Sequence, residues 1–128
     1  MRKARFLILL ITAVLISATV YFQLKPAQNF KKVTWYQWDD PLDTLGHLLG
    51  YLVLAILYAL LVFKTLPKSF TQYLIVLSPV IALGIVLELL QTLLPTRNFN
   101  IYDLAANLIG VGIAYPLALW LYQSSAST

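Results

Sequence analysis

Residues 45–63 read LGHLLGYLVLAILYALLVF, a run that contains no Asp, Glu, Lys or Arg. A helix of ~20 residues, at ~1.5 Å per residue, is long enough to cross the ~30 Å hydrocarbon core of a bilayer. The apolar residues fill a continuous block instead of one periodic stripe, which is typical of a helix surrounded by lipid. The run therefore predicts a transmembrane helix.

Three more apolar blocks lie on either side of this run, at residues 6–24, 73–94 and 101–122. Of the 128 residues, 60% are hydrophobic and only 11% are charged, and the mean hydropathy is +0.79. A soluble domain of this length needs far more charge on its surface. The sequence predicts an all-α fold, an integral membrane bundle of four transmembrane helices that forms a single domain over residues 1–128.

The net charge of +4 comes from basic residues near the ends of the blocks. No basic stripe with interleaved aromatic residues is present, so we expect no nucleic-acid binding. Arg2, Lys3 and Arg5 precede the first block and favour a cytoplasmic N-terminus by a small margin, because cytoplasmic ends of spans collect such residues. The first block continues past the ~7–15 apolar residues of a signal peptide without a cleavage site, so we expect a retained span.

Helix ends and breaks are marked by particular residues. Asp40, which precedes a proline, and Asn100 are expected N-caps of the second and fourth spans. Pro95 is expected to end the third span, because proline cannot donate a helical hydrogen bond. Pro79 and Pro116 lie inside spans and predict kinks.

Two pairs of small residues have the i, i+4 spacing that lets helix backbones approach closely. They are Gly46 with Gly50 and Gly110 with Ala114. We expect both pairs to lie at packed helix interfaces.

Polar side chains gather near one end of the second, third and fourth spans. They are Asp43, His47, Tyr51, Glu88, Gln91, Arg97, Asp103 and Asn107. The second span begins, the third ends and the fourth begins on the same side of the membrane, so all eight share one leaflet. An ionisable side chain at the centre of a span costs ~2.5–3.5 kcal/mol, so such residues indicate pairing or a functional site.

His47, Glu88 and Asp43 are the candidate catalytic residues, since a histidine beside a carboxylate can act as a general acid and base. The candidate ligand-binding residues are Arg97, Asn107, Asp103, Gln91 and Tyr51. In this hypothesis Arg97 and Asn107 hold a headgroup, and the two aspartates orient His47 and Arg97.

Structural alternatives exist for most of these residues. The two aspartates can complement helix dipoles. Arg97 can be an interfacial residue that extends its charge into water. Tyr51 can be a packing residue, and Gln91 and Asn107 can form hydrogen bonds between helices.

The expected ligand is a membrane lipid or a lipid-linked anionic molecule. Two helix N-termini point toward the site and Arg97 can bind a phosphate or carboxylate, which together favour an anion. The absence of cysteine excludes disulfides and thiolate metal ligands, and with a single histidine we expect no metal site. Nothing in the sequence indicates a particular cofactor.

The order and spacing of the polar residues is similar to that of the VanZ-like family, named after a teicoplanin-resistance accessory protein. The matching pattern is Asp43-x3-His47-x3-Tyr51 followed by Glu88-x2-Gln91-x5-Arg97-x5-Asp103-x3-Asn107-x2-Gly110. This resemblance covers residues 39–114. It implies a multi-pass protein of the bacterial inner membrane, linked in some members to glycopeptide resistance or envelope functions. The family often has Lys and Phe where this chain has Thr44 and Leu48, and the missing lysine removes one anion contact.

Three functional hypotheses follow. In the first, the protein binds an anionic amphiphile at the external leaflet, and whether it also modifies this ligand as an enzyme stays open. In the second, it is a non-enzymatic assembly or adaptor protein whose polar cluster joins the helices. In the third, it is a small proton-coupled transporter, which would need an oligomer to form a path across the membrane.

Overall fold

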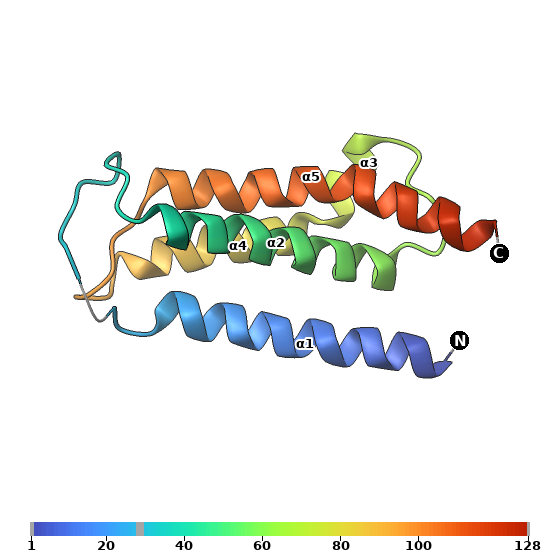
Figure 1. The fold of residues 1–128 in the computed structure, drawn as a ribbon, viewed down its shortest axis with the longest axis horizontal. Coiled ribbons are helices and arrows are strands. Elements are labelled where there is room, and N and C mark those ends of the chain that lie inside the picture. The colour runs from blue at the N-terminus through green and yellow to red at the C-terminus, as the bar shows by residue number, and fades with distance from the viewer. Residues whose placement is uncertain (1, 28–29, 128) are drawn as a thin grey trace.

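The computed structural model describes residues 2–27 and 30–127. Its elements are α1 (Arg2–Leu24), α2 (Pro41–Val62), α3 (Phe70–Val76), α4 (Ser78–Gln91) and α5 (Ile101–Ala126). No strand occurs among the described residues, so the predicted all-α fold is confirmed. Figure 1 shows α2, α4 and α5 packed together along one axis, with α1 beside them.

Helices α1, α2 and α5 are each long and apolar enough to cross a membrane. The predicted third span corresponds to a bent pair of helices, α3 and α4, which meet at an angle of 58° and make a fourth candidate span only if the pair is counted as one. The prediction of a single unbroken helix over residues 73–94 is therefore wrong. Pro79 is in the first turn of α4 and cannot donate to the preceding turn, which explains the break after Val76.

Both predicted N-caps are confirmed. The Asp40 carboxylate accepts a hydrogen bond from the Leu42 N–H at 3.0 Å, and the Asn100 side-chain oxygen accepts one from the Tyr102 N–H at 3.0 Å. Helix α4 ends at Gln91, before Pro95, and turns connect it to α5. Helix α5 runs through Pro116 to Ala126 without a break in its assignment.

The core lies mainly between α2 and α5, whose backbones come very close. A methyl group added at Gly110 would lie 2.5 Å from the carbonyl oxygen of Leu48. One turn further along α5, Ala114 is completely buried. The predicted packing role of this pair is confirmed.

The same prediction is wrong for Gly46 and Gly50 of α2. A methyl group at either position would meet no atom within 4 Å. These glycines face the space between α1 and α2 instead of a packed neighbour. Helix α1 is less buried than the other two long helices, α2 and α5, and its buried residues are Thr12 and Gln23.

Candidate functional site

The predicted polar residues lie where α2 and α5 begin and α4 ends. We call this end of the bundle, which Figure 1 shows opposite the two chain termini, the polar end. Six of the eight are buried and two are partly or largely exposed; the buried ones are His47, Tyr51, Glu88, Gln91, Asp103 and Asn107, and the others are Asp43 and Arg97. The structure thus brings residues from three helices to one region.

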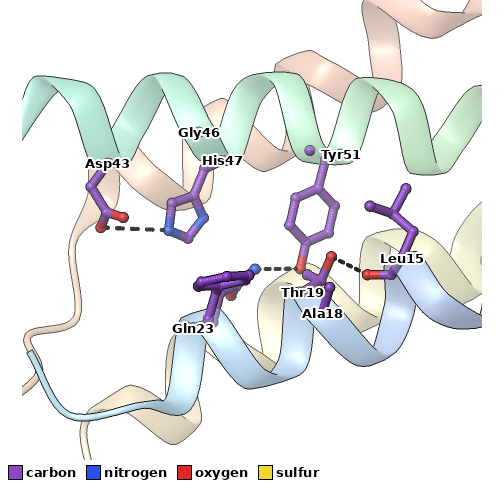
Figure 2. Close-up of a pocket in the computed structure, with 10 residues that line it drawn as sticks. Leu15, Ala18, Thr19, Gln23, Asp43, Gly46, His47 and Tyr51 are labelled. Atoms are coloured by element: carbon purple, nitrogen blue, oxygen red, sulfur yellow. Dashed lines mark hydrogen bonds and ion pairs between the residues drawn. The ribbon is translucent and has the colours of Figure 1, made fainter.

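His47 is at the centre of a group of four side chains. Its Nδ1 lies 2.8 Å from the amide oxygen of Asn107 on α5. Its Nε2 faces two carboxylates, with Asp43 Oδ2 at 3.8 Å and Asp103 Oδ2 at 4.0 Å. Figure 2 shows Asp43 and His47 facing each other from successive turns of α2. We call Asp43, His47 and Asp103 the carboxylate–histidine group.

Thr44 holds Asp103 in place. Its hydroxyl lies 2.5 Å from Asp103 Oδ1 and donates to it, so the other carboxylate oxygen turns toward His47. The indole N–H of Trp38 donates to the same hydroxyl at 3.0 Å. In the family resemblance, Thr44 is noted only because it replaces a lysine. In the structure it is a residue of α2 that positions an acid of α5 across the helix interface.

A residue of α1 that the sequence analysis missed, Gln23, joins the site. Its amide nitrogen donates to the Tyr51 hydroxyl at 3.1 Å, and its backbone oxygen accepts from Gln91 at 2.9 Å. Its side-chain oxygen is buried and accepts no hydrogen bond from any residue that the structure describes. A single amide in the last turn of an otherwise apolar span is the signal that could have identified it.

Glu88 and Arg97 lie apart from the carboxylate–histidine group and bind backbone. Glu88 is completely buried, and its Oε1 accepts from the backbone N–H of Asn100, just before α5. Arg97 donates to the carbonyl oxygens of Phe22 and Lys25 at 2.9 and 2.8 Å. Phe22 is in the last turn of α1 and Lys25 directly follows this helix, where helical partners for carbonyls are lacking.

These contacts differ from the expected division of roles. Asp103 faces His47 and Thr44 where Arg97 was the expected partner, and Asn107 binds the imidazole where a headgroup contact was expected. Arg97 fastens α1, and Glu88 satisfies a backbone donor. Tyr51 and Gln91 both bind Gln23, so they link α2 and α4 to α1.

Two cavities open at this end. The apolar cavity, of about 400 Å³, lies between α1 and α2 and is lined by residues such as Leu15, Phe22, Gly46 and Gly50 (Figure 2). The polar cavity, of about 270 Å³, lies under the connecting loops. Asp43 lines both cavities.

Charged side chains line the polar cavity, and acids outnumber bases. The acids are Asp39, Asp40, Asp43 and Asp103, and the bases are Lys31 and Arg97. An anion in this cavity therefore meets more carboxylates than cations.

The fold and the site define a multi-pass helical membrane protein with a buried polar cluster at one end of its bundle. The sequence model of the family described as VanZ/LLP1 matches residues 5–122, and the chain belongs to this family. The match extends the predicted resemblance to nearly the whole chain, including α1. Comparisons with curated proteins and with solved structures found no match.

Proposed function

We propose that this VanZ/LLP1 family protein binds an amphiphilic lipid, with one hydrocarbon chain in the apolar cavity and an anionic headgroup in the polar cavity. The observation that carries the proposal is the position of Asp43, which lines both cavities. A ligand that occupies both spaces must be apolar at one end and polar at the other. Membrane lipids and lipid-linked cell-envelope intermediates have this character.

The apolar cavity is suited to a hydrocarbon chain. It lies between two helices that are apolar enough to cross the membrane, and its volume of about 400 Å³ falls within the ~300–1,000 Å³ usual for small-molecule sites. Gly46 and Gly50 leave space that larger side chains would fill. Leu15, Ala18 and Phe22 provide the facing wall on α1.

The polar cavity provides partners for a headgroup. Arg97 and Lys31 are its cations, and the N-termini of α2 and α5 direct their positive dipole ends toward this region. A phosphate or carboxylate is the headgroup chemistry that these groups favour. His47, with two carboxylates beside it, can exchange a proton with such a ligand if the site is catalytic.

We place the polar end at the external face of the bacterial inner membrane. The basic cluster Arg2, Lys3 and Arg5 is at the opposite end of α1 and favours the cytoplasm. A lipid or lipid-linked precursor bound at the external face would connect the protein to envelope functions, among them the glycopeptide resistance that the family resemblance implies.

Lipid analysis of the purified protein tests the proposal. The parent chain and two variants are extracted in mild detergent, and co-purified lipids are identified by mass spectrometry against the total membrane extract. Gly46→Leu combined with Gly50→Leu fills the apolar cavity. Gly112→Leu is the matched control, since a Cβ added at this position of α5 also meets no atom within 4 Å and Gly112 does not line the cavity.

We expect one class of anionic amphiphile to be enriched with the parent and the control. With the double variant, the amount of this lipid per protein should fall about tenfold or more, which corresponds to ~1.4 kcal/mol of binding free energy. Equal lipid profiles for all three proteins would overturn the proposal.

A second candidate function is that of a non-enzymatic assembly or adaptor protein, which is favoured by the hydrogen bonds of Glu88 and Arg97 to backbone atoms. In that case the polar cluster serves to join helices. Substitutions in the carboxylate–histidine group would then lower the thermal stability of the protein in detergent without changing the bound lipid.

A further inference from the structure

We propose that the carboxylate–histidine group, Asp43, His47 and Asp103, binds a divalent transition-metal ion of the Zn²⁺ type. Metal binding goes beyond the proposed function, because it can be measured without any lipid. The sequence argues against such a site, since it contains one histidine and no cysteine. Folding supplies the missing ligands by placing an aspartate of α5 beside the histidine and aspartate of α2.

The spacing of the three ligand atoms suits a common ion. One potential ligand atom from each of Asp43, His47 and Asp103 lies within 4.8 Å of the other two. The distances from nitrogen to oxygen, 3.8 and 4.0 Å, are too long for hydrogen bonds. Ligand atoms that each lie ~2.0–2.2 Å from one Zn²⁺ are ~3–4 Å apart. The Asp43 side chain is 46% exposed, so it can rotate to close the remaining gap.

The hydrogen bond to Asn107 determines which nitrogen of His47 faces the carboxylates. An amide oxygen only accepts hydrogen bonds, so the Nδ1 of His47 carries the proton. In the neutral form of the imidazole, the lone pair of Nε2 is then directed at two carboxylates. In that form three electron-rich atoms face one another, and a cation or a proton between them offsets their repulsion. The side chains of His47 and Asp103 are only 4% and 10% exposed, so water screens this repulsion poorly.

The surrounding hydrogen bonds are those that a metal site needs. A histidine that binds a metal usually donates its other N–H to an oxygen, and ligating carboxylates are themselves held by hydrogen bonds. Asn107 provides the oxygen for the N–H of His47, and Thr44 provides the hydrogen bond that holds Asp103. Neither Asn107 nor Thr44 is a ligand, and each fixes the orientation of one.

Gln23 gives an independent indication of a ligand in this space. Only 7% of Gln23 is exposed, and its side-chain oxygen has no hydrogen-bond partner among the described residues. It lines the same cavity as Asp43 and His47, and in Figure 2 it extends from α1 toward α2 with its amide nitrogen directed at the Tyr51 hydroxyl. A water molecule on the ion is a hydrogen-bond donor, which is what this acceptor lacks.

One imidazole nitrogen and two carboxylate oxygens are ligand types that Zn²⁺ binds, and three protein ligands leave a position for water or substrate. The ion would also offset the excess of acids in the polar cavity and supply a positive partner for an anionic headgroup. Asp43, which borders both cavities, gives the ion a route from water.

Zn²⁺ titration of the purified full-length chain tests the inference. The protein carries an affinity tag without histidine, is stripped with a chelator in detergent or nanodiscs, and is titrated with Zn²⁺ by calorimetry. We expect one Zn²⁺ per chain for the parent, and affinity lower by about tenfold or more for His47→Gln, Asp103→Asn and Asp43→Asn. Asp39→Asn removes an acid of the same cavity outside the group, and we expect it to bind like the parent.

Thermal unfolding without metal separates this arrangement from its competitor, an imidazolium ion paired with both carboxylates. If a cation is required, Asp103→Asn relieves repulsion, and the unfolding midpoint of this variant without metal equals or exceeds that of the parent. Zn²⁺ then raises the midpoint of the parent but not that of the variant. If an ion pair is present, the metal-free midpoint of this variant falls. Asp43→Asn repeats the test at an exposed position, where folding is least affected.

The inference is overturned if the parent binds no stoichiometric Zn²⁺, if His47→Gln binds it as the parent does, or if metal-free Asp103→Asn and Asp43→Asn are both destabilised. Lipid analysis of the same preparations keeps the two proposals apart. A protein that retains its lipid and binds no Zn²⁺ overturns the metal site alone.

Discussion

Gly110 of α5 lies so close to the carbonyl oxygen of Leu48 on α2 that a methyl group would sit 2.5 Å from it. This contact allows the α2 and α5 backbones to meet and so brings Asp103 and Asn107 to His47. Gly110→Ala should therefore push the helices apart and destabilise the fold by about 1–3 kcal/mol. Thermal unfolding in detergent measures the loss. Gly112→Ala on the same helix is the control, and an equal midpoint for both variants would contradict the close packing.

Gly46→Ala and Gly50→Ala are expected to leave the stability of the protein unchanged or to raise it. An added methyl group meets no atom at either position, and alanine favours a helix over glycine by roughly 0.5–1 kcal/mol. Each variant should unfold at an equal or higher temperature than the parent. A fall in the midpoint would mean that α1 packs against these glycines more closely than the structure has it.

Arg97 is expected to hold the end of α1 in place. Arg97→Ala removes two hydrogen bonds to α1 carbonyls, a loss of about 1–2 kcal/mol in the docking of that helix. The chain has no cysteine, so spin labels on Leu9→Cys and Leu89→Cys report the distance between α1 and α4 specifically. The distance distribution should broaden in the variant.

Lys31→Ala is the matched control for Arg97, since it removes a positive charge from the same cavity and leaves both hydrogen bonds to α1 intact. Arg97→Lys should give an intermediate result, because an ammonium group cannot reproduce the forked geometry of a guanidinium. Unchanged distances in Arg97→Ala would show that α1 is held by other contacts.

Tyr73 joins α3 to α5 at the end of the bundle opposite the polar end. Its buried hydroxyl donates to the backbone oxygen of Val111 at 2.8 Å. Tyr73→Phe leaves a buried carbonyl without this donor and should cost about 1–2 kcal/mol of stability, measured by thermal unfolding. Bound lipid and Zn²⁺ should be unaffected, because this residue lies far along the helices from His47. Tyr36→Phe, at an exposed position, is the control.

The apolar blocks and the polar end were predictable because a membrane demands long apolar helices and makes every polar residue within them conspicuous. The spacing of Asp43, His47 and Tyr51 places them on one stripe of α2, and the helix order brings α5 to the same side. Helix caps at Asp40 and Asn100 were predictable for a local reason, since a cap depends on a few neighbouring residues.

Other features depend on contacts that leave no local signal. The pairs Gly46/Gly50 and Gly110/Ala114 have the same spacing, yet one borders a cavity and the other is at a packed interface. Arg97 binds backbone carbonyls, which are identical in every residue. Gln23 joins the site through partners on two other helices.

Helix α1 is fastened near both ends, by Arg97 and Gln23 at one and by Arg5, which donates to the Leu61 carbonyl, at the other. Between these points it lies beside α2 with a cavity along part of their length. A lipid of the proposed kind would enter sideways from the bilayer, between two helices, and its hydrocarbon chain would never have to cross water. Lateral entry of this type would make the rate of binding depend on how easily α1 bows outward, a property set by the residues that tie its ends.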